Sequence, residues 1–470
     1  MRKVAMLFLV IPFILTVSLS TEAAEREERQ WQDESIYYIV IDRFMNGNMD
    51  NNTGTDLDNP SAYHGGDLAG IVSQLDYIKE MGFTTIQLSP VMENEESAYH
   101  GFQVNEYREV EASFGSLENL KNVVDEAHAR EMKVIFDLPI GFVGKNHPWM
   151  EDESKDDWFT GDNIASNHPW FEGLPEINTS NSDVQQFFKE TMDYWQNETG
   201  VDGFRLISSG EVDQEWSSTG NRVLDIDYID KEKPFRNEAR EAFRQAGHSL
   251  GDLVVEEKDQ KVHQLDFYDV SRFTHLAVEE GQNPVTRWRL ALTYLFTSPG
   301  IPQLYYGTET PLDDGGNSQN LPMMNFKAGD EEIKKRIEKL TSMREQFPAL
   351  TRGDYKELYN QDGLAVFQRS YQGDTMVIAI NNAEETQSME LEDMKDDQQL
   401  RGLLHDGLVR QQKDGSYRLG MERETADVFV VESNSGYNWL FIGFVGGVLG
   451  LFVIAVILIS WKNRKADKSS

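Results

Sequence analysis

The chain has 470 residues, of which 39% are hydrophobic and 11% aromatic, enough for one large domain with a smaller companion. Its formal net charge of −36 is spread along the chain, which argues against nucleic acid or anionic lipid as a partner and favours a neutral or cationic ligand. Because the chain has no cysteine, disulfides, thiolate metal sites and cysteine nucleophiles are excluded.

The first 24 residues have the pattern of a secretory signal peptide. A basic start at Arg2 and Lys3 precedes an apolar run, and the small residues Ala23 and Ala24 follow it. The alternative is an N-terminal membrane anchor, but the run is short and ends in small residues, which favours cleavage. Residues 1–24 are therefore predicted to be removed on export.

From Trp31 to about Leu350, apolar runs alternate with helical patterns. Runs such as SIYYIVIDRF, FTTIQLSPV and MKVIFDLPI are typical of strands covered on both faces, and patterns such as LAGIVSQLDYIKEMG predict helices between them. This alternation predicts a parallel sheet, and its length favours a closed barrel over residues 31–350. Longer polar insertions follow Pro90 and Asp137, at strand ends where barrel enzymes build their sites.

A second pattern begins after residue 350. Short alternating segments such as GLAVFQRSY, TMVIAINNA and ADVFVVES predict antiparallel strands separated by turns. Residues 351–433 are therefore predicted to form a small antiparallel β-domain.

Residues 439–461, WLFIGFVGGVLGLFVIAVILISW, are apolar and uncharged. A helix of about 20 such residues crosses a bilayer core, and Trp at both ends is typical of the membrane interface. By the positive-inside rule, the basic residues that follow leave residues 462–470 as a cytoplasmic tail and the large domain outside. The sequence thus predicts a single-pass plasma-membrane protein with an extracellular domain. The basic residues are Lys462, Arg464, Lys465 and Lys468.

Several long motifs in order resemble the alpha-amylase family, glycoside hydrolase family 13. They include YHGGDLAGIVSQLDYIKEMGFTTIQLSPV, GFRL, DVSRFTHLA and TSPGIPQLYYGTE, and the likeness runs from about Trp31 to Glu432. The resemblance implies a (β/α)8 TIM barrel, an excursion after strand 3 and a C-terminal antiparallel β-domain. To these the sequence adds one transmembrane helix.

The resemblance also implies where the family's catalytic groups should lie. Retaining glycosidases need two carboxyl groups about 5 to 5.5 Å apart, one of them a nucleophile. In the family the nucleophile directly follows GFRL, and here that residue is Ile207, which can neither attack nor carry charge. Arg205, which the family places beside the nucleophile, is retained and needs a new anionic partner if it is buried.

Two further motifs depart from the family. After the third strand this chain keeps Asp137 but has Gly141 and Phe142 where the family has Asn and His. Before DVSRF the family has Asn-His-Asp, and here the triplet is Phe267, Tyr268 and Asp269. Rings thus replace two sugar-binding imidazoles, and hydrogen bonds to sugar hydroxyls are lost.

The position of the general acid is open. Glu211 in SGEV is either the family's acid, if the fourth helix is deleted, or a replacement at a sugar-binding His position, which leaves no acid; the second alignment is favoured because it needs no gap. In both, the chain between Ile207 and Asp269 is shorter than in the family. Part of the fourth helix and of the fifth strand is therefore predicted to be missing.

The segments NGNMDNN and GGD resemble the calcium loop of secreted members of the family. Hard oxygen ligands of this kind suit Ca²⁺, and the alternative is a polar turn rich in Asn and Gly. The resemblance predicts a structural calcium site. Its ligands are Asn46, Asn48, Asn51, Asn52, the Gly65 carbonyl and Asp67.

Taken together, these features predict a cell-surface amylase-like protein, catalytically inactive, that binds an α-glucan or a membrane-protein partner. The alternative is an active alpha-amylase-type hydrolase acting on α-1,4-glucans through a rearranged pair, Glu211 and Asp269. Substrate contacts are predicted for His100, which is equally suited to the core, and for Arg205 and Asp137. The aromatic residues of the excursion are candidates either for stacking on sugars or for ordinary packing. They are Trp149, Trp158, Trp170 and Phe171.

Overall fold

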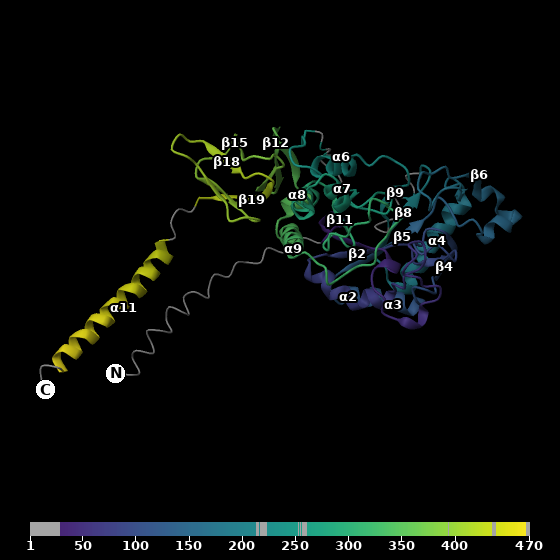
Figure 1. Cartoon of the computed structure of the whole chain (residues 1–470), viewed down its shortest axis with the longest axis horizontal. Coiled ribbons are helices and arrows are strands. Elements are labelled where there is room, and N and C mark those ends of the chain that lie inside the picture. The colour runs from purple at the N-terminus through teal and green to yellow at the C-terminus, as the bar shows by residue number, and fades with distance from the viewer. Residues whose placement is uncertain are drawn as a thin grey trace.

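The computed structural model describes residues 29–212, 216, 223–251, 253, 255, 261–392, 394–434 and 439–466. The predicted signal peptide, residues 1–24, lies outside the described residues. Figure 1 shows a barrel with helices around it, a β-domain beside it, and helix α11 extending away from that domain.

The barrel is a parallel sheet in which seven strands are described. Its hydrogen-bonded order is β10-β11-β1-β2-β5-β8-β9. The central strands are fully buried because helices cover their outer face and their inner face fills the barrel. The strands are β1 (Ile36–Ile39), β2 (Thr85–Leu88), β5 (Lys133–Pro139), β8 (Gly203–Ser208), β9 (Val223–Tyr228), β10 (Val262–His263) and β11 (Ile301–Tyr305).

Several helices begin or end at capping residues. Asp67 accepts from the Gly70 N–H at the start of α2, Ser116 and Asn119 form a capping box at α3, and Gly200 ends α4 with φ of 78°. The helices are α2 (Leu68–Glu80), α3 (Leu117–His128), α4 (Ser182–Thr199), α6 (Pro234–Phe243), α7 (Phe273–Glu279), α8 (Pro284–Thr297), α9 (Glu331–Gln346) and α10 (Pro348–Arg352), with short 3-10 turns at Trp31–Asp33, Ile41–Arg43 and Met49–Asn51.

Strand β9 corrects one expectation. The fifth strand was expected to be partly missing, yet β9 pairs with β8 in parallel, with Asp225 opposite Arg205 and Asp227 opposite Ile207. Among the described residues no ladder joins β9 to β10. Instead, the Val262 N–H donates to the Asp225 carboxylate at 3.4 Å. We call this junction between β9 and β10 the seam.

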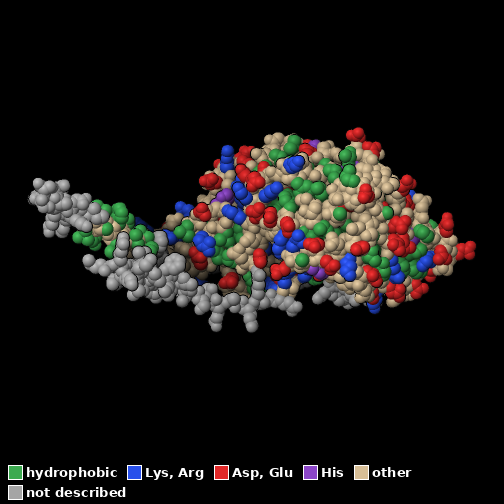
Figure 2. Space-filling view, turned by 90° about the horizontal axis from the view of Figure 1, so that it is seen from below, with side chains coloured by type: hydrophobic (Ala, Val, Ile, Leu, Met, Phe, Trp, Pro, Cys, Tyr) green, Lys and Arg blue, Asp and Glu red, His purple; other side chains and the backbone are tan. Residues whose placement is uncertain are grey.

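The predicted excursion follows β5 and folds onto the barrel end. It contains the 3-10 helices Pro148–Glu151 and Glu153–Trp158 and the hairpin of β6 (Phe159–Asn163) with β7 (Pro175–Ile177); β3 (Met92–Asn94) and β4 (Val104–Val110) form a second hairpin after β2. Figure 2 shows acidic side chains gathered at the β6 end of the molecule. The exposed ones include Glu151, Glu153, Asp156, Asp157 and Asp162.

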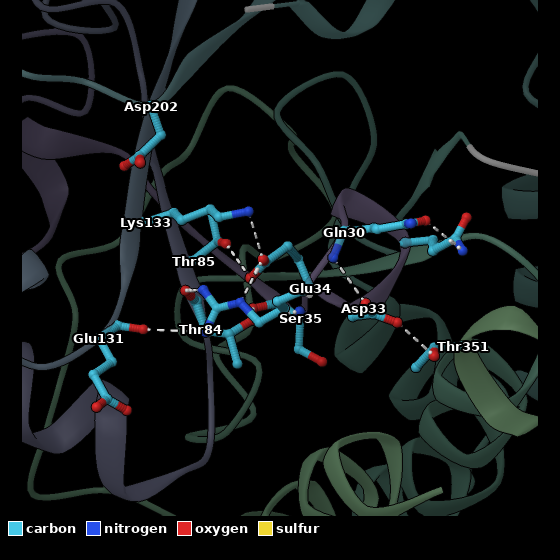
Figure 3. A network of polar contacts seen from close by, with 12 residues as sticks. Gln30, Asp33, Glu34, Ser35, Thr84, Thr85, Glu131, Lys133, Asp202 and Thr351 are labelled. Atoms are coloured by element: carbon cyan, nitrogen blue, oxygen red, sulfur yellow. Dashed lines mark hydrogen bonds and ion pairs between the residues drawn. The ribbon is translucent and has the colours of Figure 1, made fainter. Parts of the chain in front are cut away.

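Figure 3 shows a polar network at the N-terminal ends of the barrel strands. Glu34, fully buried, accepts from the Thr85 hydroxyl at 2.8 Å and pairs with Lys133 at 2.9 Å and Arg29 at 2.8 Å. Asp33 accepts from Thr351 of α10 at 2.8 Å. This end of a barrel contributes to stability rather than to chemistry, so the network fixes the strand starts.

The C-terminal domain is antiparallel, as predicted. Six strands pair in the order β12-β13-β14-β19-β16-β17, and β15 pairs with β18. Asn382 joins this domain to the barrel, because its side chain accepts from Arg287 and donates to three carbonyls in the last turn of α6 and just after it. The strands are β12 (Asp354–Gln361), β13 (Leu364–Tyr371), β14 (Asp374–Asn381), β15 (Gln387–Leu391), β16 (Gln398–Gly402), β17 (Leu408–Arg410), β18 (Tyr417–Met421) and β19 (Thr425–Ser433).

The prediction of a membrane-spanning segment is wrong. Residues 439–461 fall in α11 (Trp439–Ala466), but over the described part of the chain no helix is both long and apolar enough to cross a membrane. The single-pass plasma-membrane placement, with residues 462–470 as a cytoplasmic tail, is corrected accordingly. The apolar sequence pattern correctly indicated a helix at these residues, but it did not establish that the helix lies in a membrane.

Candidate functional site

The barrel interior is polar toward the C-terminal ends of its strands. Asp137, on β5, is fully buried; Tyr38 donates to it at 2.7 Å and the Gln87 amide at 2.5 Å. Gln303 continues the chain of hydrogen bonds by donating to Gln87 at 2.6 Å. Burial raises the pKa of Asp137 to about 7, although the nearby Arg205 opposes this. The Asp137 carboxyl group is therefore part of a buried hydrogen-bond network with Tyr38 and Gln87 rather than a free carboxylate.

Arg205 has the anionic partner that its burial requires. Its guanidinium is 3.4 Å from Asp227 and 3.9 Å from Asp225, both on the neighbouring strand β9. It also donates to Gln303 and Gln264, each at 3.3 Å. These contacts hold the buried cation in place.

The pKa values of the two aspartates of β9 are shifted in opposite directions. Burial favours the neutral form of each, but Arg205 and Lys233 outweigh this at Asp227 and hold its pKa below the ordinary value. At Asp225 burial prevails and the pKa is raised. Asp227 also forms a short ion pair with Lys233, which follows the strand. Asp227 is therefore an anion that is paired with both Arg205 and Lys233.

Ile207 is the last residue but one of β8, and its side chain is a hydrocarbon. Its side chain is fully buried, opposite Asp227 on one side and Pro139 on the other. Its carbonyl accepts from the Ile140 N–H at 2.8 Å, which fixes the turn after β5. A hydrocarbon in this position cannot attack an anomeric carbon.

Asp269 is held by a bidentate ion pair. Two guanidinium nitrogens of Arg236, on α6, lie 2.6 and 2.9 Å from its two carboxylate oxygens. Burial would raise the pKa of Asp269, but Arg236 and Lys233 hold it well below its ordinary value. A carboxylate this strongly paired is a poor proton donor and a poor nucleophile.

An aromatic stack covers His100, the residue at the predicted substrate-binding position. His100 stacks on Trp170 with ring centres 4.2 Å apart, and Trp170 stacks on Tyr268 at 5.5 Å. His100 is only 4% exposed and Trp170 7%, so Trp170 takes the place against His100 that a ligand ring would need. Burial also lowers the pKa of His100 well below its ordinary value. Trp158 and Phe171 are likewise buried, which makes them packing residues.

Glu211 does not join this group. Its side chain is exposed in the loop after β8, and its contact with the excursion is through its carbonyl, which accepts from Thr179 at 3.2 Å. Asp137, Arg205 and the β9 aspartates converge in the interior, whereas Glu211 lies outside it.

Sequence reasoning missed Asp225, Asp227, Lys233 and Arg236. The available signal was VLDIDY, in which two aspartates two positions apart lie on one face of a strand. A cavity of about 580 Å³ follows the seam beside them, lined by β9, the first turn of α6 and β10. That volume lies in the range of about 300 to 1,000 Å³ typical of small-molecule sites.

The predicted calcium loop is compact. Both Asp67 oxygens accept backbone N–H groups, from Gly47 at 3.0 Å and Gly70 at 2.6 Å on one oxygen and from Asn48 at 2.7 Å on the other. The side-chain oxygens of Asn46 and Asn51 are buried and accept no hydrogen bond from the described residues. The Asn46 amide donates to Asn52 at 2.9 Å, and a Cβ at Gly65 would lie 2.6 Å from the Asn46 amide nitrogen.

Comparison with known proteins agrees with the barrel and β-domain. A family model described as alpha amylase, catalytic domain, matches residues 38–171, and one described as alpha-amylase C-terminal domain matches residues 353–429. Among curated proteins, the beta/alpha-amylase of Paenibacillus polymyxa is 30% identical over 417 residues, covering 76% of this chain and 34% of that protein. The chain thus spans about a third of that relative's length.

Solved structures extend the match over the whole fold. An Anoxybacillus alpha-amylase is 39% identical with a TM-score of 0.80, covering 87% of this chain and 100% of that chain. An alpha-amylase from Geobacillus thermoleovorans, solved with acarbose, is 35% identical with a TM-score of 0.77 and the same coverages, 87% and 100%. The (β/α)8 barrel and its C-terminal antiparallel domain are confirmed, and the chain belongs to the alpha-amylase family, glycoside hydrolase family 13.

Proposed function

We propose that this chain is a non-hydrolysing member of the alpha-amylase family, in which the family's catalytic centre has become part of the core and the remaining role is binding. The observation that carries the proposal is the buried Ile207 at the end of β8. Neither Asp227 nor Asp269 replaces it as an unpaired carboxylate. Asp227 is paired with Arg205 and Lys233, and Asp269 with Arg236.

The aromatic stack supports the same proposal. Sugar rings bind to amylase-like sites by stacking and by hydrogen bonds to buried polar groups. Here Trp170 already lies against His100, and Tyr268 replaces an imidazole. Trp170 therefore already occupies the face of His100 on which a sugar ring would stack. Any glucan or protein partner is therefore expected to bind outside this stack.

The test is hydrolysis by the purified full chain. Starch, maltodextrin and an activated maltoside should show no turnover above buffer, and the Asp227→Asn and Asp269→Asn variants should not differ from the parent. Retaining turnover that both substitutions abolish would overturn the proposal. Glu211→Gln is the matched control, because its exposed side chain lies outside the buried group.

One observation favours a second candidate, an active α-glucan hydrolase. Asp227 lies opposite Ile207 in the register of β8 and β9 and interacts electrostatically with Asp269. Two carboxylates at one barrel end are the minimum that a glycosidase requires. For this candidate the acidic pair would be Asp227 and Asp269 rather than Glu211 and Asp269. The same hydrolysis assay decides between the two.

We also propose a structural Ca²⁺ in the loop of Asn46 to Asp67. The orphaned buried oxygens of Asn46 and Asn51 fit a cation that takes amide and carbonyl oxygens. Asp67 contributes less than the sequence implied, since one of its oxygens already accepts two N–H groups. The expected ion is bound mainly by neutral oxygens, at moderate affinity.

A further inference from the structure

A second group of metal-binding side chains lies away from the Asn46 to Asp67 loop. His275, Asp313 and Asp314 each offer a ligand atom, and these atoms all lie within 4.8 Å of one another. His275 is on α7, whereas the two aspartates follow β11. Because the segments are distant in sequence, the fold itself brings the three side chains together.

The two aspartates are held in place before any ion binds. Asp314 is 3% exposed, and its two oxygens accept the N–H groups of Arg272 at 2.8 Å and Gly316 at 3.0 Å. Asp313 accepts from Gly315 at 2.8 Å and lies 2.8 Å from His275 Nδ1. Each Asp314 oxygen keeps a lone pair for a ligand, and Asp313 Oδ1 regains one when His275 Nδ1 binds an ion instead of donating to it.

Neighbouring residues set the orientation of the His275 imidazole. A Cβ at Gly316 would come within 2.7 Å of His275 Nε2, so a residue without a side chain is needed there. Glu279, one helical turn after His275, lies 3.4 Å from the same Nε2. A metal-bound histidine commonly donates its second N–H to such a carboxylate, which fixes the tautomer that presents the other nitrogen to the ion.

We propose that His275, Asp313 and Asp314 bind one divalent first-row transition metal ion of the Zn²⁺ type, with water completing its coordination. An imidazole with two carboxylates suits such an ion, whereas Ca²⁺ and Mg²⁺ prefer oxygen ligands alone. Ligand atoms at about 2.0 to 2.2 Å from an ion are at most about 4.4 Å apart, so small side-chain rotations close the site. The Asp313 side chain, 41% exposed, leaves a path from solvent.

The competing arrangement is an ion pair without metal. A protonated His275 between Asp313 and Glu279 would show the same two contacts, and these carboxylates raise the pKa of His275. The arrangements differ in what Asp314 does. In the ion pair Asp314 acts on His275 only through its charge, whereas the metal site needs it as a direct ligand, the most buried of the three.

Cobalt titration of the full chain tests the site, with excess Ca²⁺ present to fill oxygen-only sites. One equivalent of Co²⁺ should produce visible absorption that Zn²⁺ abolishes. His275→Gln and Asp313→Asn should each weaken binding by more than tenfold, and Glu279→Gln by about tenfold through the lost orientation. His248→Gln is the matched control, a histidine beside Glu241 at 3.8 Å with no aspartate pair.

Two results would overturn the proposal: no cobalt spectrum in the parent chain, or equal affinity in the parent and in Asp313→Asn. Asp313→Asn is not expected to disturb folding, because the replaced side chain is exposed and lies outside the core. A melting curve of each variant in chelator confirms that loss of binding is not loss of fold.

Discussion

Arg205 on β8 lies 3.4 Å from Asp227 on β9, and both side chains are 3% exposed. The buried arginine thus takes its counter-charge from the neighbouring strand of the sheet. The pair explains how the barrel holds a buried cation.

Removing Asp227 should therefore cost more than removing its neighbour. Asp227→Asn leaves Arg205 and Lys233 without their main anion, and breaking a buried ion pair from one side costs about 3 to 5 kcal/mol. We expect about 3 kcal/mol in urea unfolding, because Asp225 remains 3.9 Å from Arg205. Asp225→Asn should cost less than half as much. Equal losses would show that the two aspartates share Arg205 evenly.

Restoring the nucleophile should not restore activity. Ile207→Asp places a second carboxylate opposite Asp227 in a fully buried position. Like charges and desolvation should raise the pKa of the new carboxyl group and destabilise the fold by about 3 kcal/mol or more. Ile207→Val, the control, should cost about 0.5 to 1.5 kcal/mol. Measurable maltoside hydrolysis by Ile207→Asp would contradict this.

The stability of the chain should depend on pH through Asp137. Its pKa is raised to about 7, so between about pH 4 and 7 the folded state binds a proton that the unfolded state has lost. The contribution of Asp137 is thus full at low pH and falls as pH rises through 7. As pH rises from 4 to 7, the free energy of unfolding of Asp137→Asn should increase relative to that of the parent by up to about 4 kcal/mol. Parallel stability curves for the two proteins would refute the shift.

Calcium and helix capping can be separated in the loop. Asp67→Ala should destabilise the chain by about 1 to 2 kcal/mol even in chelator, because α2 loses its N-cap. Asn51→Ala should instead remove most of the rise in melting temperature that Ca²⁺ gives to the parent. Mg²⁺, which requires a smaller octahedral shell, should stabilise the parent less. A parent whose melting curve is the same in Ca²⁺ and chelator would leave the loop as a turn.

The elements that the sequence predicted well are those in which local pattern and burial agree. The runs at β2 and β5 are continuous and apolar because both faces are covered, and capping residues mark α2 and α3. The sequence did not predict β9, because its inward positions hold Asp225 and Asp227. Two aspartates in a short segment are typical of a polar loop, and only the structure shows that they face Arg205.

The candidate site was only partly predictable for the same reason. Ile207 could be placed by resemblance, because GFRL fixes the end of a strand. The stacking of Trp170 on His100 could not, since it depends on how a long excursion folds back over the barrel. The prediction that residues 439–461 span a membrane was wrong because it was based on apolar composition alone.

The seam has a consequence for how the fold opens. Every interior strand of the sheet has two hydrogen-bonded neighbours, but among the described residues β9 and β10 each have one. Between them the Val262 N–H donates to the Asp225 carboxylate, at the long distance of 3.4 Å. Backbone amides on these two strands should exchange with deuterium sooner than those of β1 or β2. Unfolding under force or denaturant should then begin with separation of β9 from β10, and the rest of the sheet would open outward from that line.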